Sequence, residues 1–471
     1  MAIEQTLEYF KPRLDDLAIL AEVLEEDQPK LVEAVIDSSF LVRKFAEWDV
    51  ASLIRILSEY DSLIRKIHEK DNIDLSEREK VGKVAIELPY NGPAMCFGLT
   101  FAGAYLFGND VEIKFASESS PFAQTLERIM KADERTERLL HNPDKSDIFS
   151  EIRGRDFMQN HLQADSGTDM VVIYGHDRYI TPKIEEMIAT NPNVGLILEG
   201  PGKNRFIVTE DLPKELYDAC AKAIVDLATI NSGQVCMGAE IFDIHESVLP
   251  NLLPLIKQYA EQKIVGDPYL SDSDVGPIRD RIAGSVIRQI QDAKKKGADF
   301  EYFTPKVRKA EFLPEGWQEN GIAAFPKYDD SNYRYVPVVV MTGVTEDMLV
   351  RKEETFGPLI PIKPFSDEAE LYASIEQQRY GLGVSVWGRD LDTKHKQLVE
   401  QLERIHGHVF KNQYMFGDKP GQFDILLTPW GGYRNSRFLL RALPEGDIQG
   451  TQKLRIGPRY PCIDLSRPKS G

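Results

Sequence analysis

The chain has 471 residues, too many for one hydrophobic core of ordinary size, so two or three domains are expected. Hydrophobic residues make up 42% of the chain and charged residues 28%, which is ordinary for a soluble globular protein. The formal net charge of -18, with no run rich in lysine and arginine, argues against a nucleic-acid-binding surface. No nucleic-acid partner is therefore expected.

The cysteines and the first residues indicate the compartment. The four cysteines lie far apart, so they form neither a disulfide framework nor a CxxC zinc pair, and a reducing, cytoplasmic setting fits them best. The first residues lack the basic start and apolar run of a signal peptide. No apolar segment reaches roughly 18 residues, the length expected of a transmembrane helix. We therefore expect a cytoplasmic protein with no membrane partner.

The first 70 residues are predicted to be helical. Apolar residues recur at helical spacing, for example at Leu17, Leu20 and Leu24, and again at Leu53 and Ile56. This periodicity is typical of amphipathic helices that pack as a layer.

From about residue 83, short apolar runs alternate with helical stretches. Strands that alternate with helices imply βαβ units in a mostly parallel sheet, and cofactors bind at the carboxyl ends of such strands. Lys114, Gly175 and Glu199 fall at those ends. The polar stretch 131–165 is predicted to be an insertion or a long excursion. The strands are predicted at 84–86, 111–115, 171–174 and 195–198, and the helices at 93–107, 122–129 and 182–188.

A second series of helices and strands begins after Glu199, so a domain boundary is placed near residue 200. The same alternation continues in this part of the chain, and the predicted fold class is therefore α/β throughout. Helices are predicted at 213–229, 248–262 and 282–296, and strands at 336–341, 359–362, 384–387 and 408–410.

Cys236 is the first candidate for chemistry. Most lone cysteines are small buried hydrophobic residues, but this one follows Asn-Ser-Gly-Gln-Val at residues 231–235. The small residues let the backbone approach a ligand closely, and the preceding helix is expected to end just before them. The thiol is therefore predicted to lie on a loop that faces the space between two domains.

Glu199 is the second candidate. It ends an apolar strand and is followed by Gly200, Pro201 and Gly202, which places its carboxylate at the edge of the same space. The alternative is an ordinary solvated loop acid, because glutamate is usually exposed.

Four segments together resemble the aldehyde dehydrogenase superfamily. They are Leu-Pro-Tyr-Asn-Gly-Pro at 88–93, Glu-Gly-Pro-Gly-Lys-Asn at 199–204, the segment that ends in Cys236, and Glu-Glu-Thr-Phe-Gly-Pro at 353–358. Further blocks extend the resemblance from about residue 80 to 455, whereas the first 80 residues match only as helices.

The resemblance implies an architecture. Residues 1–200 would hold the N-terminal helices and a Rossmann-like nucleotide-binding domain, and residues 201–450 an α/β catalytic domain. A small oligomerisation element would combine strands at 74–85 with the tail 451–471. In it, a last strand near 453–464 would pair across a homodimer or within a homotetramer, because exposed edge strands need a partner.

The resemblance also implies a reaction. In the family, the matching cysteine attacks an aldehyde, a nicotinamide takes the hydride, and water releases a carboxylic acid from the thioester. By that match Cys236 is the nucleophile and Glu199 the base that activates water. Asn91 and the backbone N–H of Cys236 bind the oxyanion. No metal is required, and a small-molecule aldehyde is the expected substrate.

The cofactor residues match the family less evenly. Lys114 resembles the lysine that holds the adenosine ribose, but the segment after it is one residue longer than in the family. If Glu118 takes the acidic place, it favours NAD; if Ser117 does, NADP is tolerated, and both remain open. Glu354 and Phe356 match the pair that holds the nicotinamide ribose and ring.

Two departures concern the cofactor. Gly175, the first glycine of the family's helix-opening Gly-Ser-Thr-x-x-Gly, is followed here by His-Asp-Arg-Tyr-Ile, and Asp177 would repel a pyrophosphate. Gly200 is expected beside the cofactor, but Pro201 replaces a glycine and removes a backbone donor. Three alternatives therefore stay open. They are a CoA-dependent acylating dehydrogenase or acyl-CoA reductase of the same superfamily, a cysteine hydrolase without redox chemistry, and a non-catalytic scaffold of this fold.

Overall fold

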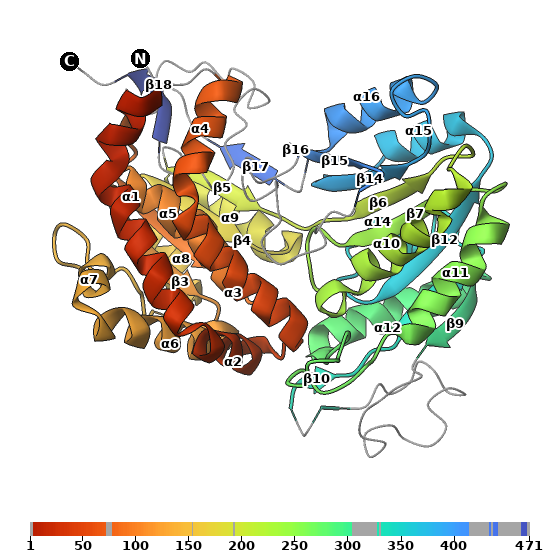
Figure 1. The fold of residues 1–471 in the computed structure, drawn as a ribbon, viewed down its shortest axis with the longest axis horizontal. Helices are drawn as coiled ribbons and strands as arrows, with labels where there is room; N and C mark the ends of the chain where they lie inside the picture. The colour runs from red at the N-terminus through yellow and green to blue at the C-terminus, as the bar shows by residue number, and fades with distance from the viewer. Residues whose placement is uncertain are drawn as a thin grey trace.

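The protein forms two α/β halves, each built around its own sheet (Figure 1). The computed structural model describes residues 3–71, 78–152, 154–191, 194–303, 327–328, 331–413, 433–434, 437–440 and 463–468. The first half runs from red to yellow in Figure 1 and contains a five-stranded sheet, one strand of which, Arg437–Leu440, comes from the blue end of the chain. The second half runs from green to blue and contains a seven-stranded sheet. This agrees with the predicted α/β class.

The first 71 residues form four helices, as their periodicity predicts. Their apolar faces are buried against the first half, and α3 packs closely on α5, the helix that follows the first long strand. Gly98 of α5 allows this approach, because a Cβ there would lie 2.9 Å from Leu53 Cδ1. The helices are α1 (Ile3–Glu26), α2 (Gln28–Ser39), α3 (Arg43–Ser58), α4 (Tyr60–Asp71) and α5 (Pro93–Leu106).

The sheet of the first half has the order β17-β5-β4-β2-β3, with β2 to β5 parallel and β17 antiparallel to β5. Helices connect the parallel strands, so the carboxyl ends of these strands lie at one edge, as predicted. The strands are β2 (Lys83–Leu88), β3 (Asp110–Phe115), β4 (Met170–Tyr174), β5 (Gly195–Glu199) and β17 (Arg437–Leu440), and the long connecting helices are α6 (Ser120–Ala132) and α9 (Asp177–Thr190).

The stretch 131–165 covers the outer edge of this sheet. The backbone N–H of Ile113 in β3 donates to the carbonyl of Ile148 at 2.6 Å, and Ser150 N–H donates to the carbonyl of Ile113 at 2.9 Å. The predicted excursion therefore protects an edge strand. It contains α7 (Glu134–Glu137), η3 (Arg138–Leu140) and α8 (Gly154–Leu162).

The sheet of the second half has the order β15-β14-β6-β7-β12-β11-β9, and β9 alone pairs antiparallel with its neighbour. Its strands are β6 (Asn204–Val208), β7 (Ala239–His245), β9 (Asp299–Phe303), β11 (Val338–Thr342), β12 (Leu359–Phe365), β14 (Gly383–Trp387) and β15 (His408–Lys411). Its helices are α10 (Tyr217–Thr229), α11 (Leu249–Gln262), α12 (Asp280–Lys295), α14 (Leu349–Lys352), α15 (Glu368–Glu376) and α16 (Lys396–Ile405).

Short elements complete both halves and the junction between them. β8 (Ile278–Arg279) pairs with β10 (Tyr333–Arg334), and β13 (Tyr380–Gly381) pairs with β16 (Tyr433–Arg434). The single 3-10 turns are η2 (Ser117–Ser119), η4 (Lys214–Leu216) and η5 (Ile230–Gly233).

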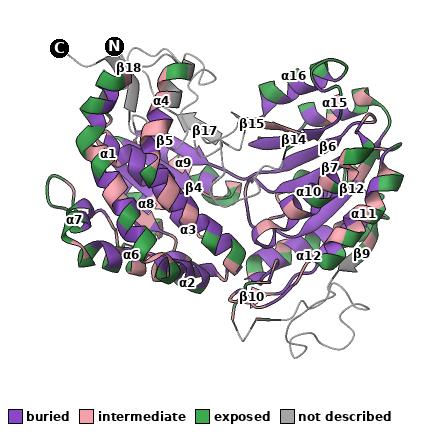
Figure 2. Cartoon of the chain, in the orientation of Figure 1, coloured by how far each residue is buried: buried purple, intermediate pink, exposed green. Residues whose placement is uncertain are grey.

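Burial follows the sheets. Figure 2 shows the strands of both halves mainly as buried residues and the exposed residues mainly on the outer faces of the helices. Strands covered on both faces need apolar residues throughout, as in β4 and β5. α5 is buried on almost every side, which explains its uniformly apolar sequence. In the described part of the chain, no helix is long and apolar enough to cross a membrane.

The last strand differs from its prediction. β18 lies at Ile463–Pro468, later than the expected 453–464, and residues 453–462 lie outside the described part. It pairs antiparallel with β1 (Arg78–Lys80) of the same chain, whereas the prediction had it pair across a dimer. β1 directly precedes β2 in the first half and can therefore pair with β18. The blue β18 returns to this half and lies close to the red α1 (Figure 1).

Candidate active site

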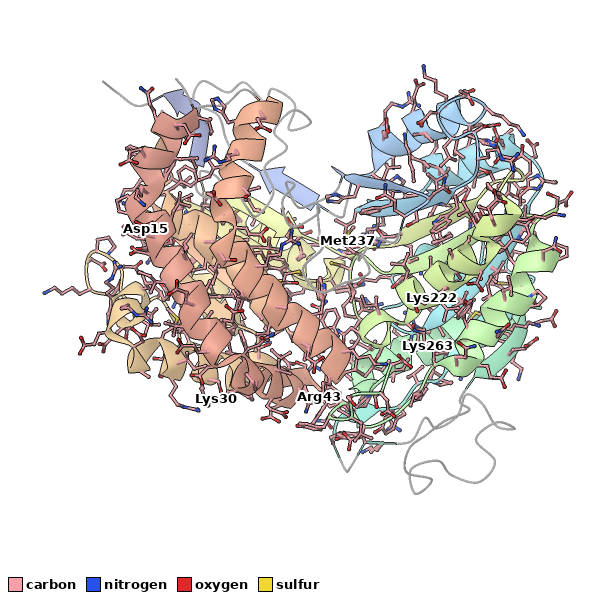
Figure 3. All side chains as sticks on the ribbon, viewed as in Figure 1. Asp15, Lys30, Arg43, Lys222, Met237 and Lys263 are labelled. Carbon is pink, nitrogen blue, oxygen red and sulfur yellow. The ribbon has the colours of Figure 1, made fainter. Side chains whose placement is uncertain are left out.

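Four turns that are far apart in the sequence meet where the two halves face each other. They follow β2, β5, η5 and α14, and hydrogen bonds connect them. Gly202 N–H donates to Glu354 Oε1 at 2.9 Å, and Asn204 Nδ2 donates to the Cys236 carbonyl at 2.7 Å. Met237, the residue after Cys236, lies in the middle of the view in Figure 3, between the two halves.

The loop that carries Cys236 has an unusual backbone. α10 ends at Thr229, and Asn231 and Ser232 then adopt positive φ angles of 47° and 59°. Gly233 continues at φ 79°, and a Cβ there would lie 2.3 Å from the Gly357 carbonyl carbon. The helix therefore ends just before the thiol, as predicted, and glycine is required by both conformation and space.

The Cys236 side chain is partly buried. Burial raises the pKa of the Cys236 thiol to about 12, and the carboxylates of Glu354 and Glu199 act in the same direction. The backbone N–H groups of Met237 and of Cys236 itself oppose this rise in pKa. The thiol is therefore protonated at neutral pH in this state, and its reaction requires a group that takes the proton.

Glu199 lies beside the thiol. It ends β5, and its residue is buried, which excludes the alternative of a solvated loop acid. Its charge raises the pKa of both Cys236 and Tyr174, which places the carboxylate among these groups. The Gly175 N–H donates to the backbone carbonyl of Glu199 at 3.0 Å and joins the ends of β4 and β5.

The turn after Glu199 packs directly on the Cys236 loop. A Cβ at Gly202 would lie 1.9 Å from the Cys236 carbonyl oxygen, so only glycine fits. Gly200 and Pro201 are also buried. Pro201 removes one donor, but the N–H of Gly202 remains and holds Glu354.

Asn91 contacts the same loop from the first half. Its Nδ2 donates to the Gln234 carbonyl at 3.0 Å, and the neighbouring Tyr90 hydroxyl donates to Gln234 Oε1 at 3.1 Å. Asp49 of α3 fixes the start of α5 behind this turn, because its carboxylate accepts the Ala94 N–H at 3.0 Å and the Met95 N–H at 2.9 Å. Sequence reasoning missed Asp49, since nothing marks it within its helix.

A buried ion pair positions Glu354 and Phe356. Lys203 Nζ donates to Glu240 Oε2 at 2.9 Å, and Glu240 also accepts the N–H groups of Thr355 and Phe356, each at 2.7 Å. Phe356 takes a positive φ of 53° in this turn. Burial raises the pKa of Glu354 well above its usual range. Glu240 was missed because its strand, β7, was not predicted.

The predicted adenosine residues lie together at the end of β3. Lys114 is in register with Glu87 of β2, and burial lowers the pKa of Lys114 while Glu87 and Glu118 oppose that effect. Ser117 is exposed in η2. Glu118 forms an ion pair with Arg279 of the second half, a partner that the sequence did not indicate.

The altered turn before α9 has its own contacts. His176 Nδ1 accepts the Arg178 N–H at 3.2 Å and caps the helix. Asp177 accepts from the Tyr380 hydroxyl and pairs with Arg379, each at 2.7 Å. The expected negative charge at this helix N-terminus is therefore offset by a cation from the second half.

Among the described residues, one group has the composition of a metal site and lies elsewhere. It consists of Glu210, Glu368 and His395. Lys394 pairs with Glu210, and His395 Nδ1 lies 2.9 Å from Glu368 Oε1. The group shares no residue with the site around Cys236.

Comparisons with known proteins give the relatives of this chain. The model of the aldehyde dehydrogenase family matches residues 9–446. The 3,6-anhydro-alpha-L-galactose dehydrogenase of Streptomyces coelicolor is 30% identical, over 71% of this chain and 61% of that protein. An NADP/NAD-dependent aldehyde dehydrogenase of Escherichia coli is 26% identical, over 90% of this chain and 78% of that protein.

Solved structures share the fold. An NADP dependent enzyme of E. coli has a TM-score of 0.74 at 18% identity, covering 96% of this chain and 84% of that one. The indole-3-acetaldehyde dehydrogenase AldA of P. syringae has a TM-score of 0.72 at 21% identity, covering 93% and 82%. The predicted fold and family are thus confirmed. The chain belongs to the aldehyde dehydrogenase family, the oxidoreductases that act on aldehydes with NAD or NADP.

Proposed function

We propose that this chain oxidises a small aldehyde to a carboxylic acid, with NAD or NADP as the hydride acceptor. The observation that carries the proposal is the convergence of Cys236, Glu199, Asn91 and Glu354 on one junction. A thiol, a buried carboxylate and an amide donor are the groups that acyl transfer through a thioester requires.

The residues act in two stages. Glu199 is the nearby carboxylate that can take the thiol proton, and the Cys236 sulfur then bonds to the aldehyde carbon. The Asn91 amide and the Cys236 N–H stabilise the charge that develops on the aldehyde oxygen. The nicotinamide, when bound, supplies the hydride acceptor. Loss of the hydride from the aldehyde carbon leaves a thioester on Cys236, and Glu199 gives the thiol proton to solvent. Glu199 then takes a proton from water, whose oxygen bonds to the thioester carbon; the carbon–sulfur bond breaks, the acid leaves and the Cys236 thiolate returns.

The residues at the strand ends fit a dinucleotide. Lys114 offers a half-buried cation and Glu118 a carboxylate at the end of β3, where an open α/β sheet binds cofactors. We propose Ser117, Gly175 and Gly200 as further contacts. Glu354 and Phe356 lie in the turn held by Glu240 and would contact the nicotinamide ribose and ring.

Release by water is preferred over release by CoA. Glu199 is retained, buried and beside the thiol, which is the place of a base for hydrolysis. The family match and the intact junction also argue against a non-catalytic scaffold. A cysteine hydrolase without redox chemistry would use a histidine as its base, and the sequence near Cys236 contains no histidine motif.

A trapping experiment tests this step. The Glu199→Gln variant, incubated with an aldehyde and NAD or NADP, should form an acyl adduct on Cys236 slowly, because solvent must then take the thiol proton, and should retain it. The adduct is seen as a mass increase of the intact protein. Wild type should release free acid without accumulating the adduct, and Cys236→Ala should form none. Acyl release by wild type only when CoA is added would contradict hydrolysis and favour the acylating alternative.

We also propose a homodimer or homotetramer in the cytoplasm. In the described part of the chain, the small sheet contains only β1 and β18, so one edge of β18 is open to another strand. An open edge is favoured to pair with a second copy.

A further inference from the structure

One ion pair joins the two halves of the molecule at the adenosine end of the site. Arg279 ends β8 in the second half, and its guanidinium contacts the Glu118 carboxylate in η2 of the first half. The side chains are 29% and 24% exposed, so both are largely shielded but reachable from solvent. Such a pair is stronger than one on an open surface.

Two contacts within the molecule fix the position of Arg279. β8 pairs with β10, with Arg279 opposite Tyr333. The Arg279 guanidinium also lies over the Tyr90 ring, 5.3 Å from its centre, and Tyr90 in turn bonds to Gln234 of the Cys236 loop. A guanidinium held by an aromatic face is pre-organised for a second, anionic partner.

The charges around Glu118 decide which cofactor fits. A lone carboxylate here would accept a hydrogen bond from the ribose 2′-hydroxyl of NAD and would repel the 2′-phosphate of NADP. Arg279 neutralises that carboxylate. Together with Lys114, it provides two cations around one ribose position, and a guanidinium binds phosphate with paired hydrogen bonds.

We propose that Arg279 is a cofactor-specificity residue, whose guanidinium turns from Glu118 to bind the 2′-phosphate of NADP. Arg279 thereby allows the chain to use NADP as well as NAD. This rests on the proposed function only in placing the adenosine ribose at Lys114 and Glu118.

Binding of adenosine fragments tests the proposal without turnover. By calorimetry, wild type should bind both 2′,5′-ADP, which carries the 2′-phosphate, and 5′-ADP, which lacks it. Arg279→Gln should weaken 2′,5′-ADP by about 10- to 100-fold more than 5′-ADP, the effect of losing hydrogen bonds to a charged group. Arg279→Lys, which keeps the positive charge, should recover part of the preference for 2′,5′-ADP over 5′-ADP that Arg279→Gln loses. Arg128→Gln removes an equal charge from an exposed position of α6 and should change neither affinity.

Glu118→Gln should act in the opposite direction. With its partner uncharged, Arg279 is freed for phosphate, so 2′,5′-ADP should bind about 10-fold more tightly relative to 5′-ADP. Equal weakening of both fragments in Arg279→Gln would overturn the proposal and make the pair a structural link between the halves. Phosphate-selective binding in a protein that oxidises no aldehyde would instead contradict the proposed function and leave this inference standing.

Discussion

At the scale of single residues, the surroundings of Cys236 favour its protonated thiol. Burial and two acidic neighbours raise the pKa of Cys236 to about 12. A protonated thiol is a poor nucleophile and resists oxidation, so this arrangement protects Cys236 from oxidation. Glu199, a carboxylate that disfavours the thiolate, is also the base in the proposed reaction.

The first prediction concerns the pH dependence of this thiol. The rate at which iodoacetamide alkylates Cys236 should rise about tenfold per pH unit from pH 7 to pH 10, because only the thiolate reacts and its fraction grows tenfold per unit below the pKa. Mass spectrometry of the peptide that contains Cys236 follows the reaction, with Cys236→Ser as the blank. A plateau below pH 9 would show that the thiol has a far lower pKa.

At this scale, the sequence marks a residue as a candidate where its neighbours form a recognisable segment. Cys236, Glu199 and Asn91 were each predicted with their neighbours, and the structure brings them together. Glu118 was predicted without its partner, since Arg279 lies in the other half and no local pattern links the two.

At the scale of elements, two strands hold the site and were the hardest to predict. β6 and β7 carry charged residues on buried positions, which breaks the apolar run expected of a central strand. The structure satisfies these charges across the strands. Lys203 pairs with Glu240 at 2.9 Å and Arg205 with Asp243 at 2.5 Å. β4, which lacks buried charges, and β5, whose one buried charge is its last residue Glu199, were predicted within one residue.

The second prediction concerns the Lys203–Glu240 pair. Lys203→Met should lower the free energy of unfolding by about 3–5 kcal/mol, because it leaves the buried Glu240 carboxylate without its cation. Urea unfolding measures the change. Lys203→Met combined with Glu240→Gln should recover part of the loss. If the double variant is no more stable than the single one, the pair is not the source of the effect.

The third prediction concerns the glycine that lets the Glu199 turn pack on the Cys236 loop. Gly202→Ala should destabilise the protein by about 1–3 kcal/mol and reduce turnover, since its Cβ would meet the backbone of the Cys236 loop. Gly284→Ala is the matched control: no atom lies within 4 Å of its Cβ in helix α12, so it should be neutral or stabilising. Thermal unfolding of both variants checks this, and equal melting temperatures would contradict it.

At the scale of the whole molecule, two ion pairs among the described residues each join an arginine of the second half to a carboxylate of the first. Arg279 reaches Glu118, and Arg379 reaches Asp177 at the start of α9. Neither contact follows from the sequence, because both depend on how two separate sheets face each other. The division into two sheets was predictable, since the strands of each sheet are local in the chain apart from β17. That strand returns from Arg437–Leu440 to pair with β5 and was not predicted.

The fourth prediction concerns assembly. The full chain, 53.4 kDa per subunit, should run as a dimer or tetramer in light scattering. A chain that ends before residue 463 lacks β18 and should dissociate toward monomer, because the open edge it offers is removed. A monomeric full chain would contradict the proposal that β18 joins two copies.

The central claim is that the chain oxidises an aldehyde through a bond to Cys236, with a nicotinamide cofactor as the hydride acceptor. The most direct measurement is the absorbance of the reduced nicotinamide with a panel of aldehydes, using NAD and NADP separately, for wild type and Cys236→Ala. Wild type should turn over at least one aldehyde and release its free acid, and Cys236→Ala should be slower by at least about 1,000-fold. Equal rates in the two proteins, or no turnover by wild type although it binds the cofactor, would contradict the account.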